Sequence, residues 1–340
     1  MSRKIIVISP VKNEEWILPS FLAAVSEYAD HIILGDHFST DKSVEIAKAF
    51  DKVSVVNSTE SDFSEATRRN QLLSCAREFG QDNVILSIDA DENLDPRFIS
   101  SGGLSELKNL PRGTRFAFPH FNIYPDTKRY WLSQIGLTGM VDDGSLHDVR
   151  DKIHFSRIPS VKGVSTYRHR FGGLIHLQYL DWERMQSKRR WYMAWEAANL
   201  EGASTLSIYR RYDHVNAISK RALRAIPAEW STFFDEKGIR KAVSDSSEFG
   251  KYWWDSEIPQ LIGGLNPAAV LTLGLAGYSK HSGMQSVGEV EFDFYHEALR
   301  KYLKVTRIFA KSSNSVISRL ALRALDKAFD SIFNRKKLNL

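Results

Sequence analysis

Cysteine is nearly absent from the 340-residue sequence, which contains only Cys75. A single thiol cannot form an intramolecular disulfide, and this favours a reducing compartment. Cys75 lies between Ser74 and Ala76 in a helical pattern, where a small buried side chain is a more common role than a nucleophile. We therefore expect a fold that depends on its apolar core and not on disulfides.

Long apolar runs are missing as well. No stretch reaches the roughly 18 uninterrupted apolar residues that a membrane-spanning helix needs. Near the N-terminus, basic residues lead directly into a strand-like segment, and no apolar run there has the length of a secretory signal. The sequence therefore predicts a cytoplasmic protein, with peripheral contact to the inner face of a membrane as an open alternative.

Two glycine-rich motifs that bind nucleotides are absent. No G-x-G-x-x-G follows the first predicted strand, so the dinucleotide-binding fingerprint is missing. No G-x-x-x-x-G-K-[ST] occurs either, which argues against a P-loop. A nucleotide, if one binds, must be held in another way.

Strand and helix patterns alternate along the first 90 residues. Apolar runs predict strands at 4–9, 31–35, 52–56 and 83–88, and helical spacing predicts helices at 17–28, 43–50 and 64–79. Proline lacks an amide hydrogen for the ladder, so we expect Pro10 to end the first strand. Such alternation favours right-handed βαβ units and a mostly parallel sheet flanked by helices.

Three acids follow the fourth predicted strand within four residues, in the stretch Asp89-Ala90-Asp91-Glu92. Ligands of open α/β sheets bind beyond the carboxyl ends of the strands. If the chain stays extended, Asp89 and Asp91 lie on the same face, and two close carboxylates repel unless a cation lies between them. The pattern predicts a site for Mg²⁺ or Mn²⁺, whose remaining ligands are usually substrate phosphates. The alternative is a solvated acidic turn.

Four sequence fragments in order resemble glycosyltransferases of family 2, which have the GT-A, Rossmann-like fold. They are PVKNEE after the first strand, GDHFSTDKS after the second, RRN in the third helix and DADE after the fourth strand. The resemblance covers about residues 4–95. It implies that Pro10, Glu14, Asp36 and Arg69 contact the nucleotide or its phosphates, and that Asp89 and Asp91 form the D-x-D motif for metal and sugar diphosphate. His37 departs from the family, which often has a second acid there.

Two further groups complete the expected site. Inverting sugar transfer needs a carboxylate to deprotonate the acceptor hydroxyl, and Asp142 or Asp143 is the expected base. The alternative is that Asp-Asp-Gly is simply a good turn. The resemblance also implies that His176, after the sheet, completes the metal site or contacts the diphosphate, although a buried histidine is more often structural.

The C-terminal part differs in composition and charge. We expect a catalytic domain at 1–200 and a mainly helical region at 201–340. The net charge of the chain is +5, but residues 300–340 hold eleven Lys and Arg against two acids. Apolar residues at four-residue steps from 316 to 333 predict a basic amphipathic helix. It can dock on an anionic membrane or pack on the protein or a dimer partner.

The predicted activity is transfer of a sugar from a nucleoside diphosphate sugar, with UDP favoured, to an acceptor hydroxyl. The expected acceptor is a glycan or lipid-linked molecule, as in polysaccharide biosynthesis. Two alternative hypotheses remain, because fold alone does not fix function. The protein could be a non-catalytic nucleotide- or sugar-binding protein, or it could be a nucleotidyltransferase. Nucleic-acid binding is not expected, because the basic tail lacks interleaved aromatic residues.

Overall fold

The computed structural model divides the chain into two compact units. The first comprises Met1–Trp182 and Ser219–Gly250, and the second comprises Glu183–Ile218 and Lys251–Leu340. The residues that the structure describes are 2–58, 65–148, 156–200, 204–213, 215, 218–246, 252–265, 267–275, 298–299, 301–306 and 316–337. The segment 219–250 returns to the first unit, so the compact units do not follow one division at residue 200. The assignment of roles to 1–200 and 201–340 stays a prediction.

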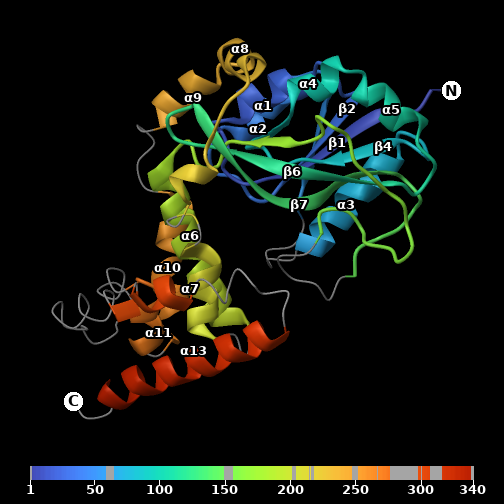
Figure 1. Cartoon of the computed structure of the whole chain (residues 1–340). Coiled ribbons are helices and arrows are strands. Elements are labelled where there is room, and N and C mark those ends of the chain that lie inside the picture. Colours follow the sequence, from blue (N-terminus) through green and yellow to red (C-terminus); the bar gives the residue numbers. More distant parts are fainter. Residues whose placement is uncertain are drawn as a thin grey trace. The chain divides into compact units, whose positions relative to one another are not determined.

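The first unit is built on a mixed sheet with the strand order β3-β2-β1-β4-β7-β6-β9-β5, and helices lie against it (Figure 1). The strands on this path are β1 (Ile5–Val11), β2 (His31–Asp36), β3 (Val53–Asn57), β4 (Val84–Ser87), β5 (Glu92–Leu94), β6 (Arg115–Ile123), β7 (Arg129–Val141) and β9 (Leu174–His176). Two short strands lie off the path: β8 (Thr166–Tyr167) pairs with β6, and β10 (Arg224–Ala225) pairs with β7.

The helices of this unit are α1 (Leu18–Val25), α2 (Ser43–Lys48), α3 (Glu65–Arg77), α4 (Pro96–Ser100), α5 (Gly103–Asn109), α8 (Ala228–Glu236) and α9 (Ile239–Ser246), with a 3₁₀ turn at Lys220–Ala222. The strands and helices predicted before residue 90 are confirmed. The four parallel strands β3-β2-β1-β4 and their crossover helices form the expected α/β sheet. The antiparallel strand β7 then pairs with β4 and extends the sheet.

Strand alternation explains how both faces of the sheet are covered. Ile5 and Val7 belong to the apolar cluster that includes residues of α1, α2, α4 and α5. Ile6 and Ile8 belong to the cluster that includes residues of α3. Because successive side chains of a strand point to opposite faces, a run of aliphatic residues is what a doubly covered parallel strand requires.

The prediction that Pro10 ends the first strand was wrong. β1 continues through Pro10 to Val11, with Pro10 paired to Gly35 and Val11 to Asp36 of β2. The Ile8 carbonyl accepts a hydrogen bond from Ile88, on the β4 side, and the Val11 carbonyl accepts one from His37, on the β2 side. By alternation, the missing amide hydrogen of Pro10 falls on the β4 side, where the pairing with β4 has already ended. The proline therefore costs no ladder bond.

The second unit is helical in the part that the structure describes. Its helices are α6 (Trp182–Asn199, whose first residue falls in the first unit), α7 (Thr205–Asp213), α10 (Ile258–Ile262), α11 (Pro267–Thr272) and α13 (Val316–Lys337), with a 3₁₀ turn at Trp253–Ser256. The predicted amphipathic helix near the C-terminus is confirmed as α13. None of the described helices is long and apolar enough to cross a membrane.

Candidate active site

The acids after β4 form a tight turn at the carboxyl edge of the parallel strands. The Glu92 amide donates to the Asp89 carbonyl at 2.9 Å, and the Asp89 amide donates to Glu92 Oε2 at 3.1 Å. The expectation that Asp89 and Asp91 alternate along an extended chain was therefore wrong. Instead, the turn reverses the chain into β5, which begins at Glu92. The acids still lie at the predicted edge of the sheet.

Glu92 is the most deeply buried acid of the turn, with no exposed surface. Arg157 forms an ion pair with it, and Arg157 Nη2 also lies 2.8 Å from Asp89 Oδ2. Burial alone would raise the pKa of Glu92, but the Arg157 guanidinium outweighs it and holds that pKa well below its usual range. Glu92 is therefore ionised, and its charge is already matched by Arg157.

One row of cross-strand neighbours places His176 beside the turn. On β9, His176 pairs with Glu92 of β5 on one side and with Asn122 of β6 on the other. Asn122 Nδ2 donates to the Trp131 carbonyl at 3.5 Å, which fixes the amide so that Oδ1 faces His176 Nδ1 at 2.8 Å.

This orientation determines the tautomer of His176. Since Asn122 Oδ1 accepts, Nδ1 of His176 carries a proton, and in the neutral imidazole Nε2 is then the acceptor with a lone pair. That lone pair lies 3.9 Å from Asp91 Oδ2, so an imidazole nitrogen and a carboxylate oxygen, both acceptors, face each other. A cation between them would satisfy both. A ring nitrogen held by an amide or carbonyl oxygen is also the usual support of a metal-bound histidine.

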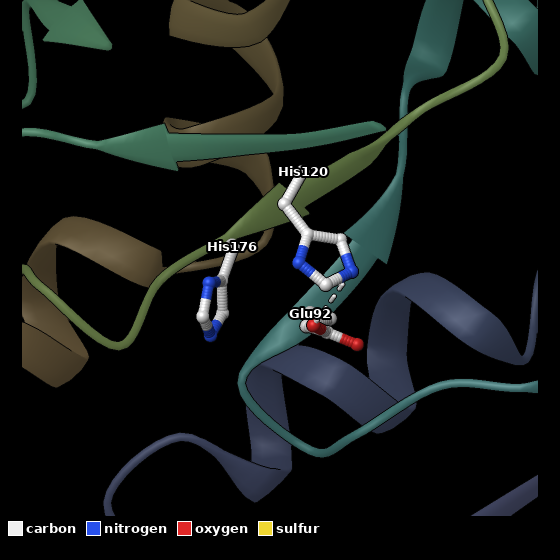
Figure 2. A group of neighbouring side chains, drawn as sticks. All are labelled: Glu92, His120 and His176. Atoms are coloured by element: carbon white, nitrogen blue, oxygen red, sulfur yellow. Dashed lines mark ion pairs between the residues drawn. The ribbon is translucent and has the colours of Figure 1, made fainter. Parts of the chain in front are cut away.

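His120 completes the cluster from β6 (Figure 2). Ligand atoms of Glu92, His120 and His176 all lie within 4.8 Å of one another, so these side chains can hold a metal ion. His120 Nε2 lies 3.7 Å from Glu92 Oε1. Burial lowers the pKa of His120 to about 4, although Glu92 acts in the opposite direction. The imidazole of His120 is therefore neutral at pH 7 and free to accept a proton or bind a metal.

Arg69 lies at the same edge. It extends from α3, is 7% exposed, and donates from Nη1 to Ser87 Oγ at 2.6 Å. Its Nη2 lies 3.6 Å from Asp89 Oδ1, which accepts no hydrogen bond in the described structure. Arg69 and Arg157 thus flank Asp89, where a diphosphate would meet both guanidinium groups.

The residues expected to hold the nucleoside lie on the first two strands. Pro10 is near the end of β1, and Asp36 is the last residue of β2. β2 and β4 both pair with β1, so the strands that carry Asp36 and the acid turn are two strand spacings apart, about 10 Å across the sheet. Asp36 is 8% exposed, and its Oδ1 is buried without a hydrogen bond. Glu14 is buried and accepts a hydrogen bond from Trp16 Nε1 at 2.7 Å, which favours a supporting role for it.

The loop after Asp36 holds a bulky residue in a left-handed conformation. Phe38 has φ +54° and a side chain that is 52% exposed. The backbone is fixed on both sides, because the His37 amide donates to the Val11 carbonyl and the Ser39 amide donates to Asp36 Oδ2. An aromatic residue in this region is strained, and such strain persists where the surroundings enforce it.

The structure does not bring Asp142 and Asp143 to this edge. β7 runs antiparallel to β4, so its last residue, Val141, pairs with Val84 at the start of β4. The Asp142 amide donates to the Asn83 carbonyl, at the opposite end of that strand from the acid turn. Asp142 binds Arg77 through Nε and Nη2, and Asp143 binds Arg115. This placement removes the reason for assigning either as the base, because an antiparallel strand reverses the edge at which its end lies.

Four functional candidates were not predicted from the sequence: Glu92, His120, Asn122 and Arg157. Glu92 was visible beside the D-x-D motif, but its burial depends on β5 pairing with β9. His120 and Asn122 follow Pro119 in β6, where a register shift between Pro119 and Phe121 interrupts the pairing with β7. Arg157 had no sequence signal, since it comes from a segment 65 residues beyond Glu92.

A comparison with protein families identifies the first part of the chain. Residues 6–102, less than a third of the chain, match the model of glycosyl transferase family 2. The matched segment includes Arg69 and the acid turn but neither histidine of the cluster. With the parallel strands and their helices, it fits a GT-A, Rossmann-like fold. No curated relative matches the chain.

Solved structures of two enzymes resemble parts of the chain. Glucosyl-3-phosphoglycerate synthase from Mycobacterium tuberculosis, in complex with Mn²⁺, UDP and phosphoglyceric acid, is 22% identical with a TM-score of 0.26, over 35% of this chain and 43% of that chain. The same enzyme with Mg²⁺ and UDP is 21% identical with a TM-score of 0.26, over 35% and 44%. 4-Diphosphocytidyl-2C-methyl-D-erythritol synthase is 14% identical with a TM-score of 0.28, over 55% of this chain and 79% of that chain. The chain thus spans less than half the length of the mycobacterial synthase.

Proposed function

We propose that the protein transfers a sugar from a nucleoside diphosphate sugar, with UDP favoured, to an acceptor hydroxyl with the help of Mg²⁺ or Mn²⁺. The observation that carries the proposal is the pair of facing acceptors, His176 Nε2 and Asp91 Oδ2, at the edge of a family 2 glycosyltransferase segment. Carboxylate oxygens suit both metals, and imidazole is compatible with Mn²⁺. Asp89, Asp91 and His176 would hold the ion.

A bound divalent metal supplies positive charge for the departing diphosphate. The chain itself contributes two further cations beside Asp89. Arg69 is fixed by Ser87, and Arg157 by Glu92, so each guanidinium is positioned before a ligand arrives. Asp36 can accept hydrogen bonds from a base or ribose at the far end of the nucleotide. Pro10 and Glu14 shape the loop between these two regions.

We assign the proton transfer from the acceptor hydroxyl to His120. The nearby acids are poorer candidates for the base. Glu92 forms an ion pair with Arg157, and Asp142 and Asp143 lie at the other end of β4. His120 is neutral at pH 7, and Glu92 Oε1 at 3.7 Å would stabilise the imidazolium that forms. The oxygen freed of its proton attacks the anomeric carbon as the diphosphate leaves. A glycan or lipid-linked molecule of polysaccharide biosynthesis is the proposed acceptor class.

A thermal-shift screen of nucleotide sugars with and without Mn²⁺ tests the proposal. A true donor at a hundredfold excess over its dissociation constant stabilises the fold by about 2.7 kcal/mol, and the shift should require the metal. Asp91→Asn should abolish the metal-dependent shift. Asp51→Asn, an exposed acid in a turn, should leave it unchanged.

Measurements of the released products distinguish a glycosyltransferase from a nucleotidyltransferase and from a binding protein. Release of UDP from the donor supports sugar transfer, whereas release of pyrophosphate from a nucleoside triphosphate would identify a nucleotidyltransferase. Metal-dependent binding without donor consumption would identify a binding protein. His120→Asn should lower kcat while the affinity for UDP and Mn²⁺ is kept. A loss of Mn²⁺ affinity in this variant would instead make His120 a metal ligand.

A further inference from the structure

Helix α13 belongs to the second unit (Figure 1), and among the described residues its contacts with the rest of that unit come from one side of the helix. Phe329 is 7% exposed and belongs to an apolar cluster with Leu206, Leu299 and Leu303, and its ring lies 4.2 Å from that of Tyr302. On the same side of the helix, Asp326 binds Arg210 and accepts a hydrogen bond from the Tyr302 hydroxyl. These contacts fix how the helix is rotated about its axis.

The face that α13 turns away from this cluster is apolar. Ile317, Leu320 and Ile332 are 79%, 59% and 56% exposed, and Leu325 is 39% exposed. The positions 317, 320, 324, 328 and 332 follow three- and four-residue steps, so they form one stripe along the helix, filled in by alanines. Of the nine large hydrophobic side chains exposed in the described part of the chain, four lie on this helix. Such concentration is unusual for a face in contact with water.

Basic residues border this stripe. Arg323 and Lys327 are both exposed and lie one turn apart on the same side of the apolar stripe. Residues 300–340 carry eleven basic residues against two acids, and one of those acids, Asp326, is occupied by Arg210. The exposed part of α13 therefore combines aliphatic side chains with an excess of positive charge.

We propose that α13 lies in the interface of an anionic lipid bilayer, with Ile317, Leu320, Leu325 and Ile332 inserted below the headgroups. The stripe supplies apolar area, and Arg323 and Lys327 meet the anionic headgroups. A helix of this kind lies along the surface and does not cross it, which agrees with the absence of a spanning helix among the described residues.

Charge favours a bilayer over a second copy of the chain. If two α13 stripes packed together, the basic residues that border them would be brought near one another, and besides Asp326 each helix has only Asp330 to offset them. An anionic bilayer offers the opposite charge over its whole surface. This proposal does not depend on the enzymatic activity proposed above, since membrane binding can be measured without a donor.

Vesicle co-sedimentation of the full chain tests the proposal. We expect binding to vesicles of equal parts phosphatidylglycerol and phosphatidylcholine, and at least about tenfold weaker partition into phosphatidylcholine alone. The apolar variant Leu320→Ser/Ile332→Ser should lose at least about tenfold in partition at unchanged net charge. The charge variant Arg323→Gln/Lys327→Gln should lose binding selectively to the anionic vesicles. The matched control, Lys48→Gln/Lys128→Gln in the first unit, should bind like the wild type.

Circular dichroism and thermal melting check that all the variants are folded, which is expected because the substituted side chains are exposed. The proposal is overturned if the folded wild type does not bind the anionic vesicles, or if the apolar variant binds as well as the wild type. It is also overturned if light scattering shows a wild-type dimer that becomes a monomer in the apolar variant while vesicles are not bound.

Discussion

At the scale of single residues, Glu92 and Arg157 decide the electrostatics of the acid turn. A carboxylate without exposed surface is unfavourable unless a cation is close, and Arg157 provides that cation for Glu92 and also contacts Asp89. The site thus has its own neutralising charge before any ligand binds. Removal of that charge should have consequences for folding as well as for activity.

We predict that Arg157→Gln destabilises the protein by about 3–5 kcal/mol at pH 7, because it leaves Glu92 buried and unpaired. Urea denaturation measures the loss. The double variant Arg157→Gln/Glu92→Gln should recover most of it, since no buried charge remains. Arg112→Gln is the control: Arg112 is 54% exposed and pairs with a half-exposed acid, so its loss should cost below about 1 kcal/mol. Equal losses in Arg157→Gln and Arg112→Gln would contradict the role of burial.

Phe38 allows a second prediction at this scale. Glycine adopts its φ of +54° without strain, whereas alanine does not, so Phe38→Gly should be more stable than Phe38→Ala by about 1 kcal/mol. Both variants lose the same ring, so the difference reports the backbone alone. At Leu146, which is exposed but has no positive φ, the alanine variant should be more stable than the glycine variant. Chemical denaturation of the glycine and alanine variants at both positions measures this, and the same order of stability at Phe38 and Leu146 would contradict backbone strain at Phe38.

At the scale of elements, the pairing of β7 determines what the acids after it can do. Because β7 is antiparallel to β4, the stretch from Asp142 begins at the edge away from the acid turn. The chain then passes along α3, where Arg77 binds Asp142 and Asn70 exchanges hydrogen bonds with the backbone of His147. We interpret Asp142 as a structural residue that holds the end of β7 against α3.

Asp142→Asn should therefore lower the free energy of unfolding by about 1.5–3 kcal/mol, the usual worth of a hydrogen bond to a charged group. Its affinity for UDP and Mn²⁺ and its kcat at 20 °C should be unchanged. Asp91→Asn should show the opposite pattern, with activity lost and stability kept. A variant at Asp142 that is fully stable but has lost its turnover would restore the assignment of this residue as the base.

At the scale of the whole molecule, buried histidines connect stability to pH. Burial is the main cause that lowers the pKa of His37, His120 and His147 to about 4, from 6.5. Below pH 6.5 the unfolded chain binds protons that the folded chain does not accept, so stability falls as the pH decreases from 6.5 to 4. Above pH 6.5 these histidines are neutral in both the folded and the unfolded chain, so they no longer lower the stability.

We predict a progressive decrease in Tm between pH 6.5 and 4. His37→Asn should make this decrease shallower, because that histidine no longer titrates in the unfolded chain. His31→Asn is a fair comparison, since the pKa of His31 is lowered by burial and Lys4 to a smaller extent. Melting curves at fixed ionic strength provide the measurement. A pH profile that is identical in wild type and His37→Asn would contradict the assignment.

The sequence by itself determined the parallel half of the sheet, its helices, the edge where Asp36, Asp89 and Asp91 lie, and the amphipathic pattern of α13. Each of these follows from local periodicity, or from the rule that carboxyl ends of parallel strands share an edge. The tertiary structure decided the rest. The burial of Glu92, the meeting of His120 with His176 and the removal of Asp142 from the site depend on pairing between strands distant in sequence. The contact between Arg157 and Glu92 joins segments 65 residues apart. Strand direction and register decide which edge a side chain reaches, and no local pattern encodes them.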